Sequence, residues 1–183
     1  MRLNNKTNMT NKFQNKYRIP SARLQNWDYG SNAAYFVTIC TQNRECFLGD
    51  ILDGIMELSE IGEMAEKYWL EIPNHFPFIF LDCYIIMPNH IHGIIEIKCR
   101  DAKFCVSTGN ENKFGPQSKN LASIIRGFKT GVKKYATINK INFVWQKSFY
   151  EHIIRGENDL NRVREYIRLN PLNWKGDRNN REY

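Results

Sequence analysis

The sequence lacks the features that would direct a protein into or across a membrane. No apolar run approaches the roughly 20 residues that span a bilayer, so we expect no transmembrane segment. The first twelve residues, MRLNNKTNMTNK, contain no apolar stretch of the kind that marks a secretory signal. The five cysteines form no C-x-x-C pair, which is typical of reduced thiols in the cytosol. These absences predict a cytoplasmic protein.

What the sequence contains is enough apolar material for one core. The chain has 183 residues, of which 42% are hydrophobic and 13% are aromatic. A chain of this length builds one domain but not two well-packed cores. The apolar content also excludes global disorder. The exception is the segment 1–17, whose Asn, Lys and Thr content predicts a disordered basic arm.

Acidic residues are absent from two long segments. Residues 1–27 contain six basic residues and no acidic one, and residues 113–150 contain eight basic residues and no acidic one. These fourteen account for the whole net charge of +7, because the other twelve basic residues face all nineteen acidic ones. Segregated positive charge favours a polyanionic partner, of which nucleic acid is the commonest. A solvated surface without a partner is the alternative.

Hydrophobic spacing predicts the order of the secondary structure. We expect a strand over 35–41, a helix over 58–72, strands over 78–87 and 90–97 around a turn at Pro88-Asn89, a helix over 121–140, a short strand within 143–154 and a helix over 159–170. Residues 99–120 lose this periodicity and predict a flexible insertion, and residues 175–183 predict a polar, frayed tail. The β-α-β-β-α-β-α order favours an α+β sandwich, in which helices pack on an antiparallel sheet.

Two histidines stand at i and i+2 in the predicted strand HIHGIIEI. Because strand side chains alternate between faces, His90 and His92 project from one face and can converge on one metal ion. A bare His-x-His pair is more often two polar residues on the solvent face of a strand. No further His or Cys stands at a spacing that suits a zinc site.

In the last predicted helix, Tyr166 and Asn170 are four residues apart and share a face. The tyrosine is a candidate nucleophile, and the asparagine offers a carbonyl oxygen one turn later. A tyrosine at the edge of the core is the plainer interpretation. Two imidazoles with an amide oxygen suit Mg²⁺ or Mn²⁺ at a phosphate better than structural zinc.

Five blocks of the sequence carry a family resemblance. They are RIPSARLQNWDYG, YFVTICTQNR, MPNHIHGII, VWQKSFYEHIIR and REYIRLNP, in this order over about residues 18 to 174. Together they closely resemble the single-tyrosine HUH transposases, and most of all the REP-associated tyrosine transposases. The resemblance implies one domain over 18–174, with a ferredoxin- or RRM-like sandwich of the HUH endonuclease type. It also implies that Tyr166 is the nucleophile and that His90, His92 and Asn170 bind a divalent metal.

The activity that this resemblance implies is metal-dependent cleavage and transfer of single-stranded DNA. Tyr166 would attack a phosphodiester at a hairpin-associated site, form a 5′-phosphotyrosine and release a 3′-OH that can later rejoin the strands. Mg²⁺ or Mn²⁺ would neutralise the charge that develops on the phosphate. The expected partners are single-stranded DNA hairpins from repeated palindromes and, since family members act as monomers or dimers, a second copy of the chain.

Several side chains are candidate contacts to this DNA. They are Arg23, Arg126, Lys129, Lys133, Trp145 and His152. Arg126, Lys129 and Lys133 follow one stripe of the helix predicted over 121–140, from which phosphate contacts would supply salt-dependent affinity. Trp145 is a candidate for stacking on unpaired bases, as are Phe149 and Tyr150. Core packing is the plainer interpretation for at least one of these three aromatic residues.

Three other functions fit parts of the pattern. A non-catalytic nucleic-acid-binding domain with an RRM-like sheet would bind single strands without needing His90 or Tyr166. A replication initiator or relaxase would share the HUH chemistry, but such proteins usually carry a further domain, for which 183 residues leave little room. A zinc hydrolase built on the histidine pair lacks a carboxylate base at a convincing spacing.

Overall fold

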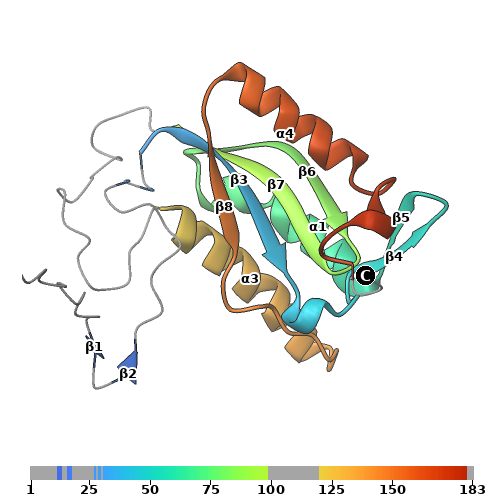
Figure 1. Cartoon of the computed structure of the whole chain (residues 1–183). Helices are drawn as coiled ribbons and strands as arrows, with labels where there is room; N and C mark the ends of the chain where they lie inside the picture. Colours follow the sequence, from blue (N-terminus) through green and yellow to red (C-terminus); the bar gives the residue numbers. More distant parts are fainter. Residues whose placement is uncertain are drawn as a thin grey trace, which may run out of the picture.

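The computed structural model describes residues 12–13, 16–17, 27, 29, 31–98 and 120–180. Its main sheet has four antiparallel strands in the order β6-β7-β3-β8 (Figure 1). Their bounds are β3 (Ala33–Cys40), β6 (Ile79–Met87), β7 (His90–Ile97) and β8 (Tyr150–Ile154). Two short pairs lie outside this sheet, β1 (Lys12–Phe13) with β2 (Lys16–Tyr17) and β4 (Gly49–Leu52) with β5 (Ile55–Leu58). The order leaves β6 and β8 as the two edges of the main sheet.

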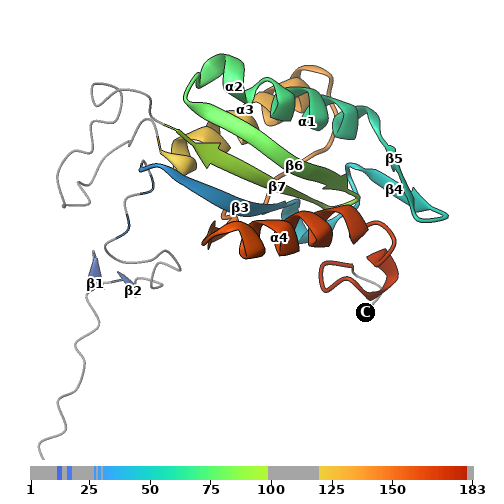
Figure 2. The same ribbon diagram turned by 90° about the horizontal axis from the view of Figure 1, so that it is seen from above.

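Helices cover both faces of the sheet. Figure 2 shows α1, α2 and α3 together on one face and α4 on the other. Their bounds are α1 (Glu60–Leu70), α2 (Ile72–His75), α3 (Leu121–Ile138) and α4 (Glu157–Leu169), with short 3-10 helices at η1 (Gln42–Arg44) and η2 (Trp174–Gly176). The predicted fold, an α+β sandwich with an antiparallel sheet and packed helices, is confirmed.

The larger core lies between the sheet and the α1–α3 face. Side chains at spacings of four on α1, among them Ala65 and Trp69, are fully buried there. The indole of Trp69 lies against Gly93 of β7, where a Cβ atom would come within 2.3 Å of a ring carbon. Glycine therefore allows β7 to approach this helix closely. Because strand side chains alternate, the residues on either side of Gly93 point to the opposite face.

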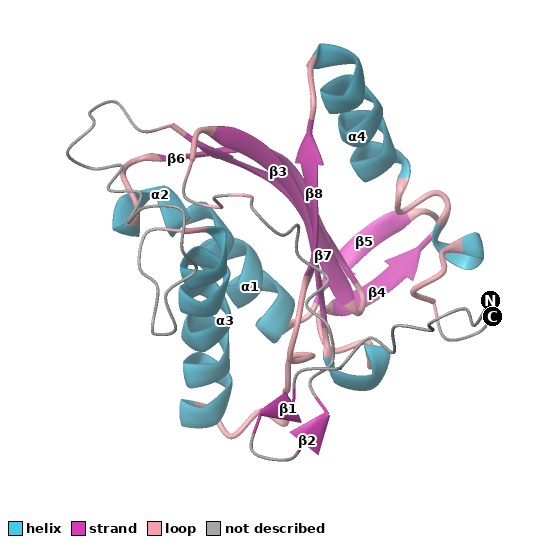
Figure 3. Ribbon diagram, turned by 60° about the vertical axis from the view of Figure 1, so that its left-hand side comes forward, coloured by secondary structure: helices cyan, strands magenta, loops and turns pink. Residues whose placement is uncertain are grey.

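A smaller core attaches α4 to that opposite face. It is formed by Phe36, Ile94, Val163 and Ile167. An ion pair reinforces it at the β6 edge, where the pairing of β6 with β7 shifts between Leu81 and Tyr84. There the Nε of Arg164 donates to Asp82 Oδ1 at 3.0 Å, and its Nη2 donates to Oδ2 at 2.5 Å. Figure 3 shows α4 separated by the sheet from α1 and α3.

The structure adds to the predicted elements and shortens one of them. The β4–β5 hairpin was not expected, because four-residue strands leave too few positions for a clear alternation. The strand expected within 143–154 begins only at Tyr150, and the preceding residues form a loop that is joined to the sheet by a bridge between Trp145 and Thr41. Most of the segment 1–17 and nearly all of the expected insertion over 99–120 lie outside the described residues. No helix within the described ranges is long and apolar enough to cross a membrane.

Candidate active site

The histidine pair lies at the start of β7, on the face that α4 covers. His90 and His92 are fully buried, and their Nε2 atoms are 3.0 Å apart. The strand spacing therefore directs both rings to one point, as predicted. The alternative of two histidines on a solvent face is wrong for this strand, because neither ring is exposed.

The outer nitrogen of each histidine is already engaged. His90 donates from Nδ1 to Asn89 Oδ1 at 2.8 Å, and His92 Nδ1 lies 2.9 Å from Thr38 Oγ1. Asn89 is itself fixed, because its Nδ2 donates to the carbonyl oxygens of Arg44 at 3.1 Å and Asn179 at 2.8 Å. These contacts turn both Nε2 atoms inward, where they face each other. With the proton of each ring on Nδ1, both Nε2 lone pairs would be free for a metal ion.

Burial keeps the two imidazoles neutral at physiological pH. Loss of solvent lowers the pKa of His90 to about 4, although the nearby Asp177 carboxylate opposes this shift. The pKa of His92 is lowered for the same reason and by its proximity to His90. A neutral imidazole is the form that can bind a cation, so the pair is ready to act as ligands without prior deprotonation.

Tyr166 extends from α4 toward the histidine pair. Its Oη lies 3.2 Å from His92 Nε2, and its ring packs edge-on against Phe36 at 5.9 Å between centroids. Burial and the Asp177 carboxylate raise its pKa, so the phenol is protonated at neutral pH. It can donate to the imidazole where Nε2 carries no proton. The residue is nevertheless 41% exposed, so part of the side chain lies at the surface.

Asn170 lies one turn after Tyr166 and is buried. Its Nδ2 donates to Asp177 Oδ2 at 3.3 Å, whereas its Oδ1 has no hydrogen-bond partner among the described residues. The side chain is close enough to His90 and Tyr166 to influence the pKa of both. A buried carbonyl oxygen without a donor costs about 1–3 kcal/mol, so a water, a ligand or an ion at this atom would stabilise the fold.

Asp177 is a member of the site that sequence reasoning missed. One of its carboxylate oxygens lies with His90 and His92 in a cluster whose ligand atoms are all within 4.8 Å of one another. The segment after η2 is not frayed as expected, because Asp177, Asn179 and Asn180 are buried. No hydrophobic periodicity marks this segment, and the hydrogen bond from Asn170 that ties it to the site is visible only in three dimensions.

These donors fit a hard divalent cation. Two ligands at right angles and about 2.1 Å from an ion lie about 3.0 Å apart, which matches the separation of the two Nε2 atoms. The orphaned Oδ1 of Asn170 supplies an oxygen ligand, and Asp177 places a negative charge beside it. The residues present could therefore hold a divalent metal ion.

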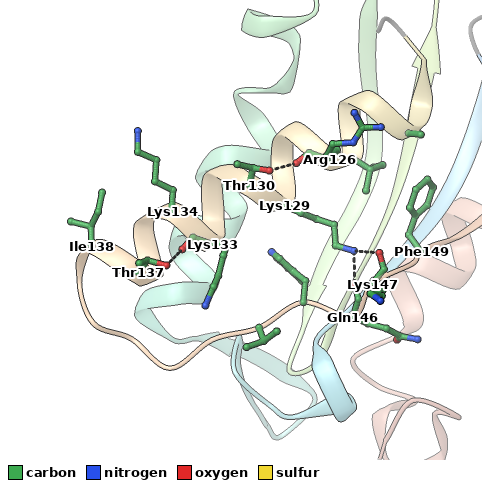
Figure 4. Close-up of a pocket in the computed structure, with 14 residues that line it drawn as sticks. Arg126, Lys129, Thr130, Lys133, Lys134, Thr137, Ile138, Gln146, Lys147 and Phe149 are labelled. Atoms are coloured by element: carbon green, nitrogen blue, oxygen red, sulfur yellow. Dashed lines mark hydrogen bonds between the residues drawn. The ribbon is translucent and has the colours of Figure 1, made fainter. Parts of the chain in front are cut away.

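The predicted DNA-contacting residues of α3 lie on the other side of the sheet. Arg126, Lys129, Lys133 and Trp145 line a groove of about 780 Å³ between α3 and residues 143–149 (Figure 4). Lys134 and Lys147 add two further cations to its walls. The groove is therefore basic, and the structure does not bring it into contact with the histidine pair.

Two of these lysines hold the groove together. Lys129 Nζ donates to the carbonyl oxygens of Gln146 at 2.6 Å and Ser148 at 3.2 Å, and Lys133 Nζ donates to that of Phe143 at 2.6 Å. Burial lowers the pKa of Lys129. Both ammonium groups thus tie the loop to α3, although the Lys133 side chain is otherwise exposed.

The remaining predicted DNA contacts, Trp145 and His152, have other partners than His90 and His92. Trp145 packs on Phe128 and Phe143, with ring centroids 5.8 and 4.7 Å away, so it is largely a core aromatic that reaches the groove with one edge. His152 on β8 pairs with Asp159 of α4 at 2.9 Å. Arg23 lies outside the described residues.

Comparison with known proteins supplies the relatives of this chain. No protein-family model matches it. A Haemophilus influenzae protein without an assigned function is 41% identical over 164 residues, which span 86% of this chain and 90% of that protein. A second Haemophilus influenzae protein, a candidate REP-associated tyrosine transposase, is 27% identical over 147 residues, or 79% of this chain and 73% of that protein.

A solved structure shares the fold. The structure of a REP-associated tyrosine transposase bound to a REP hairpin matches with a TM-score of 0.59 at 19% identity, over 85% of this chain and 74% of that one. The fold and site thus define an α+β domain with a buried histidine pair beside a helical tyrosine. The chain is similar to the REP-associated tyrosine transposases, in sequence to the second of these relatives and in fold to the solved structure. Its similarity to these proteins indicates an enzyme that acts on DNA.

Proposed function

We propose that the protein is a divalent-metal-dependent endonuclease and strand transferase that acts on single-stranded DNA beside hairpins. The observation that carries this proposal is the convergence of Tyr166 Oη, the two histidine Nε2 atoms and the orphaned Oδ1 of Asn170 at one end of the sheet. An accessible hydroxyl beside neutral ligands is what attack on a phosphodiester requires.

Tyr166 acts as the nucleophile. A bond forms between its Oη and phosphorus as the bond from phosphorus to the 3′ oxygen breaks, which leaves the strand on the protein through its 5′ phosphate. The phenolic proton leaves to solvent, to which this side chain is 41% exposed, and the departing 3′ oxygen takes up a proton. In the reverse step, a 3′-OH attacks the phosphotyrosine and releases the phenol. Strands are rejoined without ATP, because the ester conserves the energy of the broken bond.

A divalent ion completes the site in this proposal. Mg²⁺ or Mn²⁺ held by His90, His92 and Asn170 would polarise the phosphodiester and favour the phenolate over the phenol. Thr38 and Asn89 hold the two imidazoles in the orientation that ligation needs.

The basic groove beside α3 would bind the flanking DNA. Arg126 is exposed, and Lys134 and Lys147 line the same groove, so their charges are available to phosphates. Lys129 and Lys133 support this surface by fixing the loop. The transposase of similar fold is bound to a REP hairpin in its solved structure, and by analogy a DNA hairpin is the substrate that we propose here.

A covalent-capture assay tests the proposal. DNA hairpins with random flanks carry the label at the 3′ end, because a 5′-phosphotyrosine retains the 3′ segment of the strand. With Mn²⁺ or Mg²⁺, the label should migrate with the protein on a denaturing gel, and it should be lost in Tyr166→Phe. Tyr135→Phe, which changes a tyrosine on the α3 face, should leave the adduct unchanged. Hairpins that bind without any adduct would support a non-catalytic binding domain.

A further inference from the structure

A second tyrosine lies in the same row of the sheet as the catalytic candidates. Thr38 of β3 pairs with His92 on one side and with Tyr150 of β8 on the other. All three residues are direct cross-strand neighbours, so their side chains leave the same face of the sheet. Adjacent strands are about 4.8 Å apart, which places the Cα atoms of Tyr150 and His92 about 10 Å from each other.

Tyr150 is the exposed end of a group of packed rings. Its centroid lies 6.4 Å from that of Phe36, which in turn contacts His92 at 5.2 Å and Tyr166 at 5.9 Å. Phe36 is buried, whereas Tyr150 is 53% exposed. Tyr150 stays exposed because α4 lies over the β6 side of this face, whereas β8 lies at the opposite edge of the sheet (Figure 1). An aromatic ring thus lies at the surface and is linked through Phe36 to the ring of the candidate nucleophile.

The sequence that precedes Tyr150 is basic. Tyr150 is the last residue of the segment 113–150, which contains eight basic residues and no acidic one. The preceding residue, Phe149, lines the basic groove, whereas Tyr150 faces the α4 side. A strand that leaves the groove around the β8 edge therefore meets Tyr150 before it reaches Tyr166.

We propose that Tyr150 is a stacking platform for a nucleobase of single-stranded DNA, the base that flanks the phosphate attacked by Tyr166. This inference rests on the proposed function. A phosphate at the histidine pair places its neighbouring base about one strand away, over the ring of Tyr150. Base–aromatic stacking tolerates any base, so the platform positions the strand and leaves its sequence to be read elsewhere. The hydroxyl of Tyr150 takes no part.

Binding measurements in a Tyr166→Phe background test the platform without cleavage. The probe is the pool of labelled DNA hairpins with random flanks, and its dissociation constant is measured by fluorescence anisotropy. Tyr150→Leu should weaken binding about tenfold, in keeping with the usual loss of one stacked base, whereas Tyr150→Phe should stay within about twofold because it keeps the ring. Phe80→Leu is the matched control, since Phe80 is 39% exposed on the other edge strand, and it should leave binding unchanged.

Two results would overturn the platform. Equal binding by Tyr150→Leu and its parent would show that no base stacks there, even if adducts still form on Tyr166. Loss of the covalent adduct in Tyr150→Phe with Tyr166 intact would show that Tyr150 is itself the nucleophile. Adducts lost only in Tyr166→Phe, with weaker binding only in Tyr150→Leu, would support both proposals. Denaturant unfolding of each variant confirms that the fold is retained.

Discussion

Tyr166 Oη lies 3.2 Å from the same His92 Nε2 that faces His90 across 3.0 Å. The tyrosine hydroxyl therefore lies within hydrogen-bond distance of an atom that is also a candidate metal ligand. Binding of a cation at this nitrogen and the hydrogen bond from Tyr166 are mutually exclusive. This competition gives the metal site a property that can be measured without DNA.

A first prediction concerns metal binding. Mn²⁺ should stabilise the folded chain, because it binds a site that the unfolded chain lacks, and at a concentration of 100 times its dissociation constant the gain is about 2.7 kcal/mol. The thermal midpoint should rise accordingly and return when a chelator is added. His90→Gln should abolish the rise, and Tyr166→Phe should bind at least as tightly because the competing hydroxyl is gone. An equal rise in His90→Gln would place the metal elsewhere.

A second prediction concerns pH. Because burial lowers the pKa of His90 to about 4, the folded chain binds fewer protons than the unfolded chain between that value and about 6.5. Its stability should be complete above pH 6.5 and fall as the pH decreases toward 4, by up to about 3 kcal/mol from this residue. Urea unfolding between pH 7.5 and 4.5 measures the loss. His90→Gln should flatten the profile, and an unchanged slope in that variant would argue against a buried neutral histidine.

A third prediction concerns the attachment of α4. Asp82→Asn keeps the shape of the side chain but weakens its pair with Arg164, which should cost about 1 kcal/mol in unfolding free energy. Since Arg164 lies two residues before Tyr166, adduct formation should slow by up to about tenfold through misplacement of the hydroxyl. The exposed pair of Glu96 with Lys98, at 2.8 Å, provides the control. Glu96→Gln should change neither the free energy of unfolding nor the rate of adduct formation. An unchanged adduct rate in Asp82→Asn would show that the Asp82–Arg164 pair does not help to position Tyr166.

A fourth prediction concerns the packing behind the histidine strand. In Gly93→Ala the added methyl group would meet the ring of Trp69 at 2.3 Å, and both groups are held by the core. We expect a loss of about 2–3 kcal/mol, as overpacked cores show. Gly176→Ala is the control, because a Cβ there meets no atom within 4 Å, and its midpoint in urea should not move. Comparable losses in both variants would point to backbone effects.

A fifth prediction concerns the basic groove. Arg126→Gln should weaken hairpin binding several-fold. It should also reduce the slope of log affinity against log salt concentration by about 1, which corresponds to the loss of one phosphate contact. The effect should be similar for all sequences in the pool, because phosphates carry no sequence information. Lys98→Gln removes a charge just after β7, outside the lining of the groove, and is the matched control. Binding to Arg126→Gln with an unchanged salt slope would exclude the groove from DNA contact.

The elements with clear periodicity were predictable from the sequence. The apolar stripe of α3, with Ile124, Phe128 and Val132 buried, required only spacings of three and four. Alternation in HIHGIIEI placed both histidines on one face, and the i, i+4 spacing placed Asn170 beside Tyr166. These are local rules, so they hold wherever the element forms.

The rest of the site depends on contacts between distant segments. Asp177 reaches the histidines only because the chain after α4 turns back, a path held by Asn89 and Asn170. The loop over 143–149 looked like a strand because its aromatic residues resemble strand residues, yet Trp145 and Phe143 pack into the core as side chains of a loop. The engagement of Lys129 with backbone carbonyls likewise has no signature in the sequence.

The most direct test of the account is to locate the covalent bond. The protein is incubated with Mn²⁺ and the hairpin pool, digested with nuclease and protease, and the peptides are analysed by mass spectrometry. The account predicts a nucleotide 5′ phosphate on Tyr166 within the peptide that spans α4, and its absence when His90→Gln is used. A nucleotide on any other residue, or an adduct that persists without His90, would contradict it.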